Sequence, residues 1–391
     1  MFTLIQGAEL YTPTSMGTMD VLFAGTKVLA IEKNIQLDTS VHVHRLNGEG
    51  YLLVPGFVDS LVHITGGGGE AGFASRTPEM NLSDATLAGI TTVVGALGTD
   101  ASSRTLTGLI AKAKGLKEQG LNVFCHTGSY HLPAKTLGRS ISDDIMYIDE
   151  FIGVGEVAIS DHRSSQPTAQ QLAELAAQSK VAGMLSAKAG IVSIHVGSAP
   201  THLELLHQVC AQSDLSLTQF YPTHMNRNQA LVEAGIRFCQ QGGTIDFTAS
   251  TTEFDLANGE LAAAQAVAYC LKQGVSASQL TMSSDGHASL PIFDAQLNLI
   301  GLEVGTEQAL LSSFQQAVQT YAVSIEHALM TITANPANLL GLNKGSIDVG
   351  SDADLVLLDK HTLTPHYVWS NGLLMVEQGK ALIKGMFESS P

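Results

Sequence analysis

Short runs of β-branched and apolar residues alternate with amphipathic stretches over most of the chain. Eight such runs are predicted as strands, at residues 54–64, 91–97, 122–128, 151–159, 191–197, 217–223, 244–250 and 280–286. Between them, residues 168–185, 228–242 and 259–274 carry apolar positions at helical spacing. Eight strands in βα alternation favour a closed α/β fold, a TIM-like (β/α)₈ barrel, over an open doubly wound sheet. The glycine run after the first strand lacks the spacing of a dinucleotide-binding turn.

The two ends of the chain follow another pattern. Residues 20–33, 41–46, 353–359 and 373–385 alternate with a period of two and show no helical periodicity. We therefore expect residues 1–53 and 345–391 to form one small β-sandwich domain and residues 54–344 to form the barrel. His42 and His44 lie one residue apart on the strand at 41–46, outside the barrel, and are predicted to be surface histidines.

Composition excludes several classes of function. The formal charge of −16 comes from scattered carboxylates, which argues against binding to nucleic acid. Four separated cysteines suit reduced thiols in a cytoplasmic protein. No basic segment precedes an apolar one at the start, and no apolar run approaches the length that spans a bilayer, so no membrane partner is expected.

Polar side chains stand where the predicted barrel strands end. The active site of such a barrel is built at these C-terminal ends. The residues concerned are His63, Glu156, His195, His224 and Asp285. Each alone is weak evidence, since a single histidine is more often structural and Asp-Gly is often a turn. Together they are the nitrogen and carboxylate ligands that zinc or a similar divalent ion requires.

The chain resembles the amidohydrolase superfamily, and within it the isoaspartyl (β-aspartyl) dipeptidases, over essentially its full length. The resemblance is carried by "PGFVDSLVHITGGGGEAG", "GALGTD", "AISDHRSSQPT", "PTHMNRN", "GGTIDFTAS" and "SSDGHASLP". It implies a distorted barrel with a small β-sandwich, hydrolysis of β-aspartyl dipeptides, and assembly as a homo-oligomer.

The resemblance also implies a metal centre. His63 matches the second histidine of a His-x-His pair, Glu156 the bridging carboxylate, and His195 and His224 the further ligands. Leu61 replaces the first histidine, so one metal position loses a ligand. One zinc ion held by Glu156, His195 and His224 is favoured; two ions with an altered set of ligands, or a disabled site, remain open.

The remaining roles follow from the same resemblance. Asp285 is the proton carrier, and Tyr130 polarises the scissile carbonyl. The residues implied in substrate binding are Glu70 for the α-ammonium, Gly68 in the glycine run, Arg163 and Arg227 for the carboxylates, and Thr99 and Ser289 as hydrogen-bonding groups. His162 is a candidate partner behind a metal ligand. The alternatives are another amidohydrolase activity, such as a different dipeptidase, deacetylase or cyclic-amide hydrolase, or a catalytically silent homologue.

Overall fold

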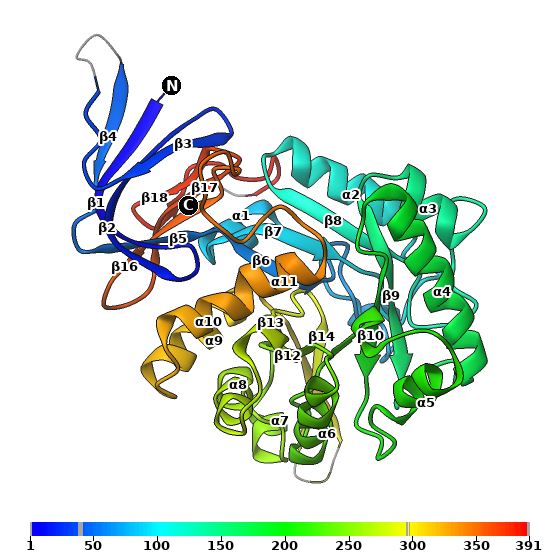
Figure 1. The fold of residues 1–391 in the computed structure, drawn as a ribbon. Helices are drawn as coiled ribbons and strands as arrows, with labels where there is room; N and C mark the ends of the chain where they lie inside the picture. Colours follow the sequence, from blue (N-terminus) through cyan, green and yellow to red (C-terminus); the bar gives the residue numbers. More distant parts are fainter. Residues whose placement is uncertain (1, 38–41, 295, 297, 389–391) are drawn as a thin grey trace.

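The computed structural model describes residues 2–37, 42–294, 296 and 298–388. Figure 1 shows a large region of parallel strands and helices beside a β-rich region that contains both ends of the chain. No helix in the described ranges is long and apolar enough to cross a membrane.

The eight predicted barrel strands are all present. They are β6 (Phe57–Val62), β7 (Ile90–Gly95), β8 (Asn122–Thr127), β9 (Phe151–Ile159), β10 (Ile191–Val196), β11 (Phe220–Thr223), β12 (Ile245–Thr248) and β13 (Leu280–Ser283). The first six form one parallel sheet in chain order, and β12 pairs with β13 in parallel. Backbone hydrogen bonds complete the ring: Met225 donates to Asp246 (3.1 Å), and Asp285 donates to Leu61 (3.1 Å). The predicted α/β barrel is confirmed.

Helices cover the outside of these strands, as Figure 1 shows. The longer ones are α2 (Leu106–Glu118), α4 (Ala169–Ser186), α5 (Glu204–Gln212), α6 (Gln229–Gln240), α8 (Ala263–Lys272), α9 (Gln308–Gln319) and α10 (Ile325–Ile332). Shorter ones are α1 (Leu82–Leu87), α3 (Ile141–Tyr147), α7 (Glu253–Ala257) and α11 (Ala334–Leu339). The three predicted helices correspond to α4, α6 and α8. Thr168 and Gln171 form a capping box that fixes where α4 begins.

Two predicted strands begin later than expected. The run at 54–64 breaks at Gly56, where an added Cβ would lie 2.1 Å from Thr91 Oγ1. Only glycine permits this close packing, and the chain passes there from β5 (Tyr51–Pro55) to β6. Residues Leu217–Gln219 form a 3₁₀ turn, closed by the bond from Gln219 N to Ser216 O (3.0 Å), before β11 starts.

Strands from both ends of the chain form one nine-stranded sheet. Its further strands are β1 (Phe2–Tyr11), β2 (Ser15–Ala24), β3 (Lys27–Glu32), β4 (Val43–Asn47), β16 (Leu355–Asp359), β17 (Pro365–Ser370), β18 (Leu373–Glu377) and β19 (Lys380–Ala381). Strand β5 lies between β1 and β16 and joins the two ends. Division into domains at 1–53 with 345–391 and at 54–344 stays a prediction, and residues 1, 38–41 and 389–391 lie outside the described ranges.

Two further features are the histidines at β4 and a hairpin that follows the last barrel strand. His42 and His44 are exposed beside and on β4, as expected of surface histidines; Val41 of the same run is not among the described residues. An antiparallel hairpin, β14 (Ser289–Phe293) with β15 (Leu299–Val304), follows the last barrel strand and was not predicted.

Candidate metal centre and substrate cavity

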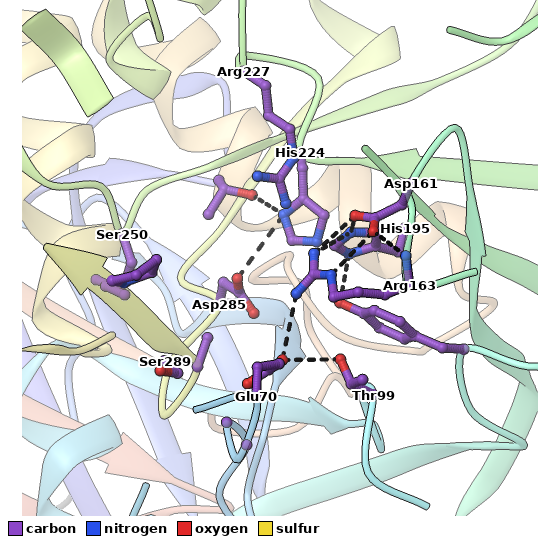
Figure 2. A pocket seen from close by; sticks show the side chains of 18 of the residues that line it. Glu70, Thr99, Asp161, Arg163, His195, His224, Arg227, Ser250, Asp285 and Ser289 are labelled. Atoms are coloured by element: carbon purple, nitrogen blue, oxygen red, sulfur yellow. Dashed lines mark hydrogen bonds and ion pairs between the residues drawn. The ribbon is translucent and has the colours of Figure 1, made fainter. Parts of the chain in front are cut away.

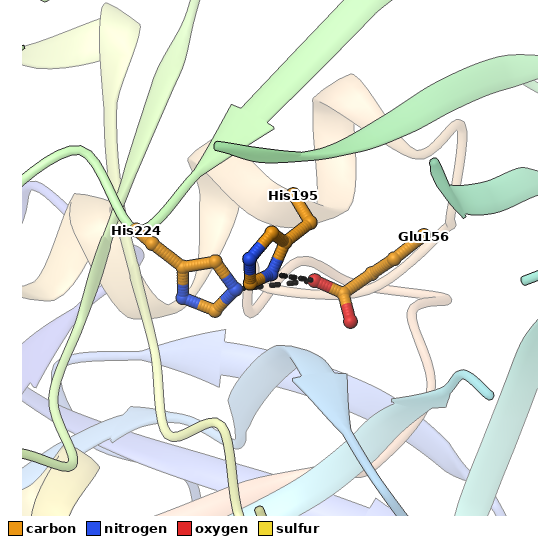
Figure 3. A group of neighbouring side chains, drawn as sticks. All are labelled: Glu156, His195 and His224. Carbon is orange, nitrogen blue, oxygen red and sulfur yellow. Dashed lines mark hydrogen bonds and ion pairs between the residues drawn. The ribbon is translucent and has the colours of Figure 1, made fainter. Parts of the chain in front are cut away.

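Three buried side chains meet at the C-terminal ends of neighbouring strands. Glu156 lies in β9, His195 in β10 and His224 directly after β11. Glu156 Oε2 is 3.3 Å from His195 Nδ1 and 3.1 Å from His224 Nε2, as Figure 3 shows. All three ligand atoms lie within 4.8 Å of one another. Zinc bonds of roughly 2.1 Å in tetrahedral geometry place ligands about 3.4 Å apart, so the group fits one divalent ion.

Each histidine of this group has a hydrogen-bond partner on the side of the ring away from Glu156. His195 Nε2 hydrogen-bonds to Asp161 Oδ2 (2.9 Å), and His224 Nδ1 hydrogen-bonds to Thr248 Oγ1 (2.6 Å). Such bonds orient the rings; when the far nitrogen is the donor, the opposite nitrogen keeps a lone pair that can bind a metal ion. The partner of His195 is thus Asp161; the predicted candidate, His162, has a side chain that is 90% exposed.

The protonation states of Glu156 and His224 suit the binding of a cation. Burial alone would raise the pKa of Glu156, but the neighbouring imidazoles of His195 and His224 outweigh burial and hold the pKa well below its ordinary value. Burial and the neighbouring His195 lower the pKa of His224 to about 4. An ionised carboxylate beside a neutral imidazole is the protonation state that metal binding requires.

A second set of ligand atoms lies beside the first. His63 Nε2 is 3.3 Å from Asp285 Oδ1 and 3.8 Å from Glu156 Oε1. Neither carboxylate oxygen has a hydrogen-bond partner in the part of the chain that the structure describes. Because His63 Nδ1 faces the carbonyl of Ala96 (3.2 Å), which can only accept, Nδ1 carries a proton and Nε2 is the nitrogen that faces the carboxylates; in the neutral ring Nε2 presents a lone pair.

Leu61 leaves this second metal position with one ligand fewer. Alternation along β6 places Leu61 on the same face as His63, inside the barrel, and the side chain is 2% exposed. Its isobutyl group supplies no lone pair. Three ligand atoms therefore remain where the family pattern would supply four.

Two further polar residues lie near the ligands. The Tyr130 hydroxyl is 2.7 Å from His195 Nδ1. Burial, with a contribution from Glu156, holds the pKa of Tyr130 well above its ordinary value, so it remains a hydrogen-bond donor. His126 on β8 is fully buried, and neither of its ring nitrogens has a hydrogen-bond partner among the described residues. Burial lowers its pKa to about 4, so it is neutral.

The ligands open into a cavity of about 620 Å³. Every predicted substrate-binding residue lines it: Gly68, Glu70, Thr99, Arg163, Arg227 and Ser289. Figure 2 shows Glu70 between Thr99 and Arg163: its Oε1 accepts a bond from Thr99 Oγ1 (3.0 Å) and lies 3.4 Å from Arg163 Nη1. The volume lies in the range of small-molecule sites.

The two arginines differ in how far they are engaged. Arg163 donates from Nε and Nη2 to the two oxygens of Asp161 (3.0 and 2.8 Å), which occupies one edge of its guanidinium. Arg227 donates from Nε to the carbonyl of Val196 (2.9 Å) and makes no ion pair within the described ranges. Arg227 is therefore the cation better placed to receive a carboxylate.

The glycine run shapes one wall of the cavity. Gly68 has a φ of +72°, and an added Cβ would lie 2.7 Å from Ser75 O and 2.9 Å from Ser289 Cβ. Glycine is required there by both conformation and space. The run thereby brings Ser289 and the backbone of Gly68 together at the cavity edge.

Comparison with known proteins agrees with this geometry. The amidohydrolase family profile matches residues 52–378. A structure of the β-aspartyl dipeptidase from Fervidobacterium islandicum AW-1, in complex with β-Asp-Leu, is 40% identical with a TM-score of 0.91 and covers 97% of each chain. A second structure of that protein is 38% identical, with a TM-score of 0.89 and coverage of 97% of this chain and 98% of that one.

Sequence relatives with another activity also match. A dihydroorotase from Acetivibrio thermocellus is 24% identical over 394 residues, covering 91% of this chain and 89% of that protein. A dihydroorotase from Clostridium botulinum is 43% identical, but over only 56 residues, which is 14% of each chain.

Proposed function

The chain belongs to the amidohydrolase family, and on that premise we propose that it hydrolyses the β-aspartyl peptide bond of dipeptides. The proposal rests on one cavity in which a carboxylate (Glu70) and a guanidinium (Arg227) lie around the ligand group; Arg227 makes no ion pair with any described residue. A free dipeptide is a zwitterion, and these two groups match its ammonium and carboxylate.

Glu156, His195 and His224 would hold the metal ion, for which we propose zinc. The donor set of two imidazoles and one carboxylate suits it; Glu156 Oε1 and Asp285 Oδ1, which have no hydrogen-bond partner among the described residues, would take a second ion together with His63. When bound, such an ion lowers the pKa of a water molecule towards neutrality and polarises a carbonyl.

The chain's own residues supply the remaining steps. The Tyr130 hydroxyl donates to the carbonyl oxygen of the scissile amide as negative charge develops there. Asp285 accepts the proton of the attacking water and returns it to the leaving amine. Burial raises the pKa of Asp285, but His63 and His224 outweigh burial and lower it, so this carboxylate is ionised and ready to accept.

Recognition of the aspartyl part separates β-linked from α-linked dipeptides. Glu70, held by Thr99 and Arg163, fixes the ammonium at a set distance from Tyr130. Moving the peptide bond from the side chain to the main chain displaces that ammonium, so an α-linked dipeptide loses its contact with Glu70. We also propose that the protein acts in the cytoplasm as a homo-oligomer.

Hydrolysis of β-Asp-Leu and of α-Asp-Leu, followed by release of leucine from zinc-supplemented protein, tests the proposal. We expect turnover of the β-linked substrate alone. Equal turnover of both would contradict the role of Glu70, and turnover of neither would refute the function. Cleavage of a cyclic amide in the latter case would identify the alternative amidohydrolase activity.

A further inference from the structure

A second group of potential metal ligands lies outside the proposed catalytic centre. Asp84 stands in the first turn of α1, His287 in the loop after β13, and Glu307 at the start of α9. Their ligand atoms all lie within 4.8 Å of one another. The proposed function uses none of the three.

The imidazole of His287 is oriented as a ligand. Its Nδ1 is 3.0 Å from the carbonyl oxygen of Pro78, which has no proton to give, so Nδ1 carries the proton and donates. In the neutral ring, Nε2 then presents its lone pair. A bond from the far nitrogen to a backbone carbonyl is how proteins orient metal-binding histidines, and His63 is held in the same way by Ala96.

That nitrogen faces two carboxylates at distances that suit an ion between them. His287 Nε2 is 3.5 Å from Asp84 Oδ2 and 3.6 Å from Glu307 Oε1. Both distances exceed a good hydrogen bond and are close to the roughly 3.4 Å that separates two ligands on one tetrahedral ion with bonds of about 2.1 Å.

Glu307 supplies an independent sign of a missing partner. The residue is 1% exposed, yet its Oε1 has no hydrogen-bond partner among the described residues. Space for the carboxylate is created by Gly286, where an added Cβ would lie 2.5 Å from Glu307 Oε1. A polar atom that is buried without a partner costs free energy, and a cation at this point removes that cost.

We propose that Asp84, His287 and Glu307 bind a divalent first-row transition metal ion such as Zn²⁺. One imidazole and two carboxylates form a donor set for such an ion, and solvent supplies the remaining ligand beside Asp84, whose side chain is 34% exposed. The site is distinct from the catalytic centre and does not depend on the proposed function.

The position of this ion gives it a structural role in the active site. Gly286 O accepts a bond from His63 N (2.9 Å), and His287 O accepts bonds from Gly67 N (3.1 Å) and Thr77 Oγ1 (2.6 Å). The loop that carries Asp285 is thereby tied to the glycine run. An ion on His287 fastens the loop to α1 and α9 as well, which fixes Asp285 relative to the substrate cavity.

Metal stoichiometry tests the proposal. The full-length protein is stripped with a chelator, dialysed against Zn²⁺, and its bound metal is measured by elemental analysis. The test variant is His287→Asn, because asparagine tolerates the φ of +60° at this position but is a poor zinc ligand. We expect this variant to bind one equivalent fewer than the unmodified chain.

Two further variants make the result decisive. Asp84→Asn keeps an acceptor for the capping bond from Asn81 N, so helix α1 stays capped while the ligand charge is lost; we expect it to lose the same equivalent. Glu79→Gln removes a neighbouring exposed carboxylate that pairs with Lys112, and should lose none. If both test variants fold, by circular dichroism, and bind as much zinc as the unmodified chain, the site is refuted. If His287→Asn unfolds, Asp84→Asn alone decides.

Discussion

Asp161 should determine how tightly the proposed site binds its metal ion, although its carboxylate lies behind His195 and not in the ligand group. Its Oδ2 is 2.9 Å from His195 Nε2. Burial raises the pKa of Asp161, but the bonds from His195 and Arg163 outweigh burial and hold it far below its ordinary value, so Asp161 is ionised at every working pH. Asp161→Asn therefore removes a full charge while it keeps the shape.

The expected magnitude follows from that single bond. A hydrogen bond to a charged group contributes about 1.5–3 kcal/mol and a neutral one about 0.5–1.5 kcal/mol, so the loss is about 1–1.5 kcal/mol. About 1.4 kcal/mol corresponds to a tenfold change in a binding constant. We expect zinc affinity to fall by about 5- to 13-fold, which reaches the low end of the 10- to 100-fold typical of residues behind metal ligands.

Competition with a chromophoric chelator measures this affinity directly. Asp255→Asn is the matched control, because Asp255 lines the same cavity but bonds to Thr252 rather than to a metal ligand. If Asp161→Asn and Asp255→Asn hold zinc equally well, the argument that Asp161 orients His195 is refuted. A loss confined to Asp161→Asn supports it.

Four other changes have defined outcomes. Leu61→His should raise bound metal by up to one equivalent in elemental analysis, and unchanged stoichiometry would show that the second position cannot be completed there. Asp285→Ala should lower kcat on β-Asp-Leu by about 10²- to 10⁴-fold while the metal on Glu156 is retained; full activity would exclude Asp285 as the proton carrier. Arg227→Met removes a charged contact of about 1.5–3 kcal/mol and should raise KM by about 10- to 100-fold with a smaller effect on kcat; an unchanged KM would exclude the contact. Burial raises the pKa of Asp59 to about 8, so between its ordinary value and 8 the folded chain holds a proton that the unfolded chain has lost, and stability falls as pH rises; Asp59→Asn should flatten the fall in Tm between pH 5 and 8, and equal slopes would contradict this.

The strands of the barrel could be predicted because each is a short β-branched run with a glycine or polar stop. Their ends then place the candidate ligands together, since parallel strands of a barrel all end at the same rim. His63, Glu156 and Asp285 illustrate this, because they are far apart in the sequence. The structure brings a carboxylate oxygen of Glu156 and one of Asp285 within 4 Å of His63 Nε2.

The sequence could not determine which side chain turns inward at an irregular bend. Ser160 has a φ of +52°, and this turn after β9 directs Asp161 towards His195 while His162 points to solvent. Two adjacent polar residues in a loop carry no periodicity that distinguishes them. The sequence also could not predict the group of Asp84, His287 and Glu307, because its members come from three elements that only the tertiary fold brings together.

The pairing of β5 with both β1 and β16 has a consequence for the order in which the protein folds during synthesis. Strand β5 leaves the ribosome about 300 residues before β16, its neighbour in the sheet. Until then one edge of β5 has no strand to pair with, and it stays open to other chains. Strand β16 therefore covers the free edge of β5, and a chain cut before Leu355 would leave the N-terminal strands prone to aggregation.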